Sequence, residues 1–243
     1  MLESLGITAG AQPGPANQPG TASPAPPSRR RTRVAPATSL RAVIFDFGGV
    51  LWDMRWDVAR DLDRLHGLPR SSVFETLYRC EAWSGIECGA GDPAAWIEGA
   101  HRELERRAGQ ALPRLHEEWR KAQALIAANI AVVRALRPAY RCSVLSNADL
   151  SLRGRLEREL GLHDLFDDIV VSAEVGMAKP RPEVFQLAAE RLRLPPEACV
   201  FVDDWDRNVE AARDVGMQAV LHRVDQGHDL RAQLGALGVA AGA

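Results

Sequence analysis

Carboxylates, a hydroxyl, amides and one lysine follow short apolar runs at several points in this sequence. An accessible carboxylate can attack an electrophile or bind a hard cation through its oxygens. A hydroxyl and an ammonium group can hold or neutralise an anionic group while it is transferred. The residues at these positions are Asp46, Ser146, Asn147, Lys179, Asp203, Asp204 and Asn208.

Each of these positions also has a structural explanation when it is taken alone. Asp46 precedes two glycines and can set a turn, and Ser146 can cap a helix. Asp204 can cap the helix that follows it, and a lysine is usually solvated. Four apolar runs with polar ends in one chain are nevertheless hard to explain by turns and caps alone. Lys179 also stands out because it is one of two lysines among 30 basic residues.

The elements that must position these side chains are predicted by apolar periodicity. Five runs of strand length, rich in Val and Ile, suit strands that are covered on both faces, and amphipathic stretches between them suit helices. This alternation predicts an α/β fold with a doubly wound parallel sheet. Ligands bind beyond the carboxyl ends of such a sheet, so the reactive side chains should meet there. The expected strands are 42–46, 142–147, 168–172, 199–204 and 218–222, and the expected helices are 151–161, 182–193 and 208–216.

The domain organisation is predicted by the places where this alternation is interrupted. Residues 1–40 are rich in Pro, Ala and Arg without apolar periodicity, so we expect a disordered tail there. Residues 57–137 lie between the first two strands and have the pattern of several helices, which predicts a small helical cap domain. The catalytic core is then expected in residues 41–56 and 138–243.

Composition and charge exclude several classes of partner. The formal net charge is −2, and the arginines of residues 1–41 leave the rest of the chain more acidic, which argues against a nucleic-acid partner. No apolar run is long enough to span a membrane. The first residues have neither the basic nor the apolar segment of a secretory signal, so we expect a cytoplasmic protein, as a monomer or homodimer. The four cysteines have no metal-ligand spacing and are expected to be free thiols.

In its order of motifs the sequence resembles the haloacid dehalogenase-like hydrolase superfamily, in subfamily IA, whose helical cap lies between the first and second motifs. The resemblance covers residues 42–222. Asp46 matches the aspartate that ends the first motif, and Ser146 matches the hydroxyl of the second. Lys179 lies in a GMAKPRPEVF segment that matches the third motif, and Asp203-Asp204 match the acidic pair of the fourth.

This resemblance implies a Rossmann-like core with a helical cap, and a phosphatase that uses Mg²⁺. It makes Asp46 the nucleophile that forms an aspartyl-phosphate, and it makes the expected substrate a small phosphorylated metabolite, with a sugar phosphate as one candidate. Ser146 and Lys179 are expected to take part in catalysis, and phosphate binding is expected from Ser146, Asn147 and Lys179. The implied metal ligands are Asp46, the backbone carbonyl of Gly48 and Asp204, with Asp203 and Asn208 supporting them.

The sequence departs from the common family pattern at Gly48, where most phosphatases of the family carry a second aspartate that protonates the leaving oxygen. The gap predicts a narrow or slow enzyme that works best on leaving groups of low basicity. Two alternatives stay open: a metal-independent haloacid dehalogenase, and a non-catalytic sugar-phosphate-binding or interaction protein. The candidates for substrate contacts, which packing also explains, are Trp52, Asp53, Trp56 and Trp83.

Overall fold

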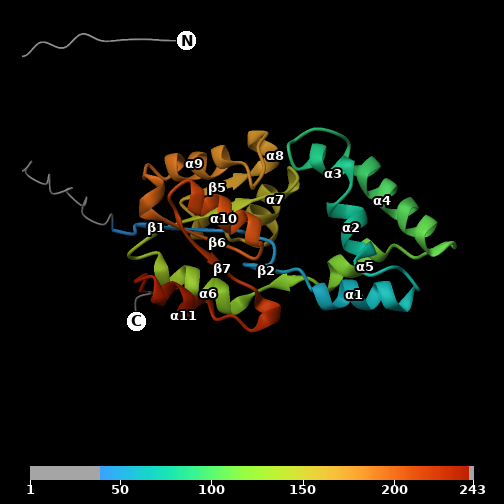
Figure 1. Cartoon of the computed structure of the whole chain (residues 1–243). Coiled ribbons are helices and arrows are strands. Elements are labelled where there is room, and N and C mark those ends of the chain that lie inside the picture. Colours follow the sequence, from blue (N-terminus) through green and yellow to red (C-terminus); the bar gives the residue numbers. More distant parts are fainter. Residues whose placement is uncertain (1–38, 241–243) are drawn as a thin grey trace, which may run out of the picture. The chain divides into compact units, whose positions relative to one another are not determined.

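The computed structural model describes residues 39–240 of the chain (Figure 1). The predicted disordered tail, residues 1–40, lies almost wholly outside this range. Within residues 39–240, no helix is long and apolar enough to cross a membrane.

The centre of the fold is a five-stranded parallel sheet in the order β5-β4-β1-β6-β7 (Figure 1). The chain moves outward from β1 in both directions, which confirms the predicted doubly wound α/β fold. All five expected strand segments form strands, each within a residue or two of the expected bounds. They are β1 Ala42–Phe45, β4 Arg141–Ser146, β5 Asp168–Val171, β6 Cys199–Asp203 and β7 Gln218–Leu221.

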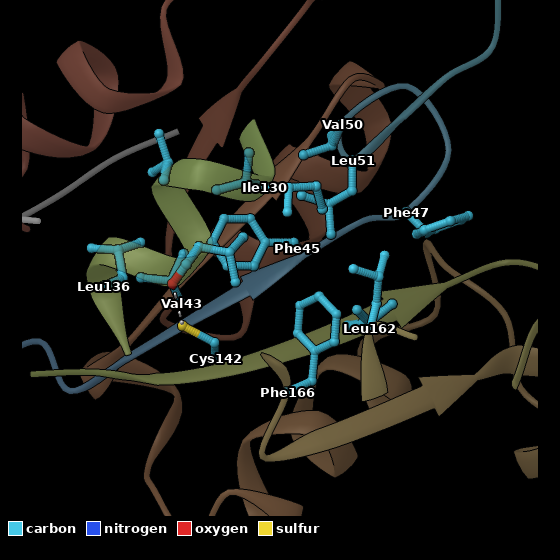
Figure 2. Close-up of a cluster of buried hydrophobic side chains, with 14 of the residues drawn as sticks. Val43, Phe45, Phe47, Val50, Leu51, Ile130, Leu136, Cys142, Leu162 and Phe166 are labelled. Carbon is cyan, nitrogen blue, oxygen red and sulfur yellow. Dashed lines mark hydrogen bonds between the residues drawn. The ribbon is translucent and has the colours of Figure 1, made fainter. Parts of the chain in front are cut away.

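Helices cover both faces of this sheet because side chains along β1 alternate between the faces. Val43 and Phe45 pack on one face with residues of α6, α7 and α11 (Figure 2). Ala42 and Ile44 pack on the other face with α9 and α10. All four β1 side chains are fully buried, which explains the continuous apolar run in the sequence. The helices are α6 Ala127–Leu136, α7 Ser151–Gly154, α8 Ser172–Val175, α9 Pro182–Arg191, α10 Asp206–Asp214 and α11 Leu230–Ala236.

One expected helix differs from a regular α-helix. The segment 151–161 begins as α7 and continues as a π-helical turn, η1 Arg155–Glu159, in which the Leu160 N–H donates to the Arg155 carbonyl. The wider turn places the Arg155 guanidinium 3.9 Å from the ring centre of Trp52. Apolar spacing alone does not distinguish these two kinds of turn, because both bury Leu152 and Leu156.

A second group of helices, α1–α5, packs around its own apolar cluster, which includes Trp83, Trp96 and Trp119. We call these helices the cap and the rest of the described chain the core. Two short antiparallel strands, β2 Trp52–Asp53 and β3 Ala124–Leu125, lie where the chain enters and leaves the cap. The cap helices are α1 Trp56–Leu65, α2 Ser72–Tyr78, α3 Glu81–Ile86, α4 Pro93–Ala108 and α5 Leu115–Ala122.

Helix α6 lies within residues 57–137, the range predicted for the cap. Helix α6 buries Ile130, Val133 and Leu136 in the cluster beneath the sheet, so it belongs to the core (Figure 2). We therefore propose that the cap ends near residue 122. The periodicity of residues 57–137 did not reveal this change of partner, because a helix has the same apolar spacing whichever layer it covers.

Candidate active site

The carboxyl ends of three neighbouring strands bring the predicted residues together. Asp46 directly follows β1, Ser146 ends β4 and Asp203 ends β6. Because β1 lies between β4 and β6, these three side chains meet at one edge of the sheet. Lys179 reaches the same edge from the loop after α8.

The Lys179 ammonium group connects the nucleophile position with the acidic pair. Its Nζ lies 3.0 Å from Oδ1 of Asp46 and 2.7 Å from Oδ2 of Asp203, and the lysine side chain is almost completely buried. The two carboxylates outweigh the cost of burial and raise the pKa of Lys179, which keeps it charged. The N–H of Phe47 also donates to Oδ1 of Asp46, at 2.6 Å. Oδ2 of Asp46 therefore remains the oxygen best placed to attack.

Asp203 is buried beneath the site and holds several of its neighbours through hydrogen bonds. Its Oδ1 accepts a hydrogen bond from the Trp205 N–H at 2.8 Å, and the amide of Asn208 donates to both carboxylate oxygens at 3.1 Å. Its side chain is fully buried, whereas that of Asp204 is half-buried. The supporting role predicted for Asp203 and the metal-ligand role predicted for Asp204 remain predictions.

Asp204 lies close to the turn that follows the nucleophile. A Cβ on Gly49 would lie 2.1 Å from Oδ2 of Asp204, and the φ of Gly49 is +81°, so this position requires glycine. Burial, together with the charges of Asp46 and Asp203, raises the pKa of Asp204 well above its usual value. Asp204 is thus held near two like charges, while Lys179 forms its salt bridges with Asp46 and Asp203.

The residues present fit a divalent cation. Oxygens of Asp46, Asp203 and Asp204 lie within 4.8 Å of one another. Within residues 39–240, Lys179 is the one basic side chain that forms salt bridges with these carboxylates, and it pairs with Asp46 and Asp203 only. In the same range, the carbonyl of Gly48 accepts no backbone hydrogen bond. Oδ1 of Asn208 is also buried without a partner there, which suits a water of the hydration shell that Mg²⁺ tends to keep.

Ser146 and Asn147 have different environments. Ser146 is buried at the end of β4. The side chain of Asn147 is fully engaged: its Oδ1 accepts from the Lys179 N–H at 2.8 Å, and its Nδ2 donates to the Lys179 carbonyl and to Glu87. Asn147 therefore positions Lys179. The predicted contact of Asn147 with phosphate remains a prediction, and its backbone N–H is the group that could make this contact.

A pocket of about 350 Å³ opens between the cap and the core beside these residues. We call it the cap pocket. On the core side, the pocket is lined by Asn147, Lys179 and Trp205. The guanidinium of Arg79 lies over the Trp205 ring, 5.5 Å from its centre. The cap lines it with Tyr78, Arg79, Glu81, Trp83 and Glu87 among others.

Sequence reasoning predicted a contact for one cap residue of this pocket, Trp83, and missed Glu87 and Arg79. Both lie in the insertion, where no motif marks them. The sequence does carry one signal there, the closely spaced glycines Gly85, Gly89 and Gly91, which indicate a tight approach of backbone to another segment.

A second pocket, of about 360 Å³, lies on the Asp204 side of the site. It is lined by Asp53 and Trp56, two of the predicted contact residues, and by Arg223, which donates to the Asp204 carbonyl. Trp52 instead stacks on Phe47 at 5.9 Å. The cap pocket is the better place for the organic part of a substrate, because it contains both Lys179 and Asn147.

Several known proteins are similar in sequence to this chain. The profile of the haloacid dehalogenase-like hydrolases matches residues 40–216. Phosphatase MT3486 of Mycobacterium tuberculosis is 34% identical over 196 residues, covering 75% of this chain and 87% of that protein. The phosphorylated carbohydrates phosphatase of Thermotoga maritima is 31% identical over 202 residues, covering 79% and 90%.

A solved structure shares the fold. It is a haloacid dehalogenase family enzyme of Bacteroides thetaiotaomicron in complex with magnesium and inorganic phosphate. The TM-score is 0.62 at 20% identity, and the match covers 80% of this chain and 98% of that one.

Proposed function

The chain belongs to the haloacid dehalogenase-like hydrolases and is a phosphatase of that family, and we propose that it removes phosphate from a small phosphorylated metabolite with Asp46 as nucleophile. A sugar phosphate is the leading candidate, because the Thermotoga relative acts on phosphorylated carbohydrates. The match with this chain covers most of the length of both relatives, and both relatives are phosphatases. We therefore prefer this activity to the dehalogenase and non-catalytic alternatives.

The observation that carries the proposal is the position of Lys179 between Asp46 and Asp203. An ammonium group that is held 3.0 Å from Oδ1 of the nucleophile can neutralise the charge of a phosphoryl group approaching Oδ2. Ser146 lies at the same edge, and its hydroxyl can donate a hydrogen bond to a phosphoryl oxygen. The Asp46–phosphorus bond forms as the ester oxygen departs, and water then releases phosphate from the aspartyl-phosphate.

We propose that Asp46, Asp204 and the carbonyl of Gly48 hold Mg²⁺. When bound, the cation supplies positive charge between the carboxylates and the phosphoryl oxygens. This proposal is supported by the excess of buried carboxylates over lysine in the site. Asp203 and Asn208 then hold the ligands and the lysine in place.

The remaining features of the proposal concern the setting of the enzyme. We expect a cytoplasmic monomer or homodimer with no membrane partner. We also expect no nucleic-acid partner, because the net charge of the chain is slightly negative.

The proposal is tested by measuring phosphate release from a panel of phosphorylated metabolites, with Mg²⁺ and with a chelator. We expect turnover of one substrate class, sugar phosphates first, and loss of that turnover when the cation is removed. Equal rates with and without divalent cation would contradict the metal site. Turnover of nucleotides alone would contradict the proposed substrate class.

A further inference from the structure

The cap contributes a carboxyl group to the pocket in which the leaving group must lie. We propose that Glu87 protonates the leaving oxygen in place of the aspartate that is missing at position 48. This role rests on the proposed phosphatase function. It identifies a donor for the proton of the leaving oxygen, which Gly48 cannot supply.

Glu87 is joined to the catalytic lysine through one residue. Its Oε2 accepts a hydrogen bond from Nδ2 of Asn147 at 3.0 Å, and the same amide group binds the Lys179 backbone on both sides. Glu87 and Lys179 also line the same pocket. In an in-line displacement the leaving oxygen lies opposite the attacking oxygen, so it points away from Asp46 and towards the cap.

The approach of the cap to the core is built into the backbone near Glu87. Gly89 has a φ of +80°, and a Cβ at this position would lie 2.2 Å from the carbonyl oxygen of Ala173 in α8. Only glycine allows this contact. Glu87 is therefore held against the core by a backbone contact two residues away as well as by its bond to Asn147.

The environment of Glu87 favours the protonated acid that this role requires. The carboxyl is half-buried, and burial raises its pKa, while hydrogen bonds from Asn147 and Trp83 and the charge of Lys179 oppose the rise. A substrate phosphate in the pocket brings further negative charge, which raises the pKa again. The carboxyl of Glu87 can donate its proton while Oε2 continues to accept from Asn147.

The proton balance closes over one turnover. As the bond from phosphorus to the ester oxygen breaks, that oxygen takes the proton of Glu87 and leaves as an alcohol. The Glu87 carboxylate then accepts a proton from the water that attacks the aspartyl-phosphate. Phosphate is released, Asp46 is regenerated and Glu87 is again protonated.

Two other carboxylates near the site are less suitable. Asp53 accepts a hydrogen bond from the Arg55 N–H at 2.8 Å and lines the second pocket, on the Asp204 side. Glu81 lines the cap pocket but is exposed in the first turn of α3, and it forms no salt bridge with a core residue within residues 39–240. Glu87 is the carboxyl that combines the pocket with a fixed contact to the lysine loop.

The test compares leaving groups. Wild type, Glu87→Gln, Glu81→Gln and Glu117→Gln are assayed for kcat/KM on a series of phosphate monoesters from aryl to primary alkyl, after equal melting temperatures have been checked. Glutamine can still accept from Asn147 but carries no acidic proton. Glu117 is exposed on α5 and is the matched control.

We expect Glu87→Gln to lose roughly 10²–10⁴-fold on alkyl phosphates and little on aryl phosphates, because aryl oxides leave without a proton. Wild type should depend only weakly on leaving-group basicity, in contrast to the steep dependence that Gly48 alone predicts. Equal losses on both ends of the series, or no loss, would overturn the role of Glu87. The same split in Glu81→Gln instead would assign the proton to Glu81. If wild type releases phosphate from no ester, the proposed function itself fails.

A second variant of Glu87 tests the acidic proton without introducing an amide at this position. Glu87→Asp keeps an acid on a shorter side chain, so it should retain more alkyl activity than Glu87→Gln. Identical alkyl rates for the two variants would show that the acidic proton of residue 87 is not used.

Discussion

At the scale of single residues, the two glycines after the nucleophile have different neighbours. A Cβ on Gly48 would meet the sulfur of Met54 at 3.4 Å, an ordinary contact, whereas a Cβ on Gly49 would overlap Asp204. We expect Gly49→Ala to lose at least about 1 kcal/mol of stability through its positive φ and roughly 10²-fold in kcat through displacement of Asp204. Gly48→Ala should keep the wild-type melting temperature. Thermal melts and turnover of the two variants check this, and equal behaviour would contradict it.

The acidic pair provides a second comparison. Asp203→Asn removes the charge that pairs with buried Lys179, so we expect a loss on the order of 3 kcal/mol in the free energy of unfolding. Asp204→Asn removes a carboxylate that its neighbours repel, so without metal its stability should equal or exceed that of wild type. Its activity should need more Mg²⁺. Urea unfolding and Mg²⁺ titration separate the two, and reversed results would exchange the roles of the aspartates.

The sequence was sufficient to place the core residues of the site but not those of the cap. Asp46, Ser146 and Asp203 lie at the carboxyl ends of strands with continuous apolar runs, so their meeting point could be deduced from topology. Asn147 shows the limit of this reasoning, because a side chain at a strand end can face a neighbouring loop instead of the ligand. Glu87 could not be found, because its function depends on where the cap packs.

At the scale of elements, the cap contains a buried histidine that joins two helices. Nε2 of His116 in α5 lies 3.1 Å from Oγ1 of Thr76 in α2. Burial lowers the pKa of His116 from 6.5 to about 4. As the pH falls, this histidine therefore binds a proton in the unfolded chain before it does so in the folded chain. The contribution of neutral His116 to the free energy of unfolding is complete above pH 6.5 and is lost towards pH 4, by up to about 3 kcal/mol.

Replacing this histidine should remove that pH dependence. We expect the unfolding free energy of His116→Gln to fall less than that of wild type between pH 6.5 and 4. The exposed His163 provides the control, because His163→Gln should follow wild type. Urea unfolding monitored by the fluorescence of the cap tryptophans measures all three proteins. Parallel curves for wild type and His116→Gln would contradict the prediction.

Elements were predictable where their apolar pattern has one explanation. Strands β1 and β6 are covered on both faces, and helix α9 begins with a proline in its first turn. The π-helical turn of η1 and the change of α6 from cap to core could not be predicted, since neither alters the spacing of buried residues. Tertiary packing determines both.

At the scale of the whole molecule, the N-terminal segment differs in composition from everything after it. Residues 1–38 contain prolines and arginines but no apolar periodicity, so they offer little surface with which to dock on the body. We expect a chain that begins at residue 39 to keep the melting temperature and turnover of the full chain. A fall in either quantity would show that the segment packs on the enzyme.

The central claim is that Asp46 attacks phosphorus, and one measurement tests it most directly. Phosphate release from an aryl phosphate is measured with Mg²⁺ for wild type and for Asp46→Asn, whose amide has the shape of the carboxylate but cannot attack. An aryl ester is chosen because its release does not require a proton donor. We predict Mg²⁺-dependent release by wild type and a loss of at least about 10³-fold in a folded Asp46→Asn protein. Release by the folded variant at a rate near that of wild type would contradict the claim.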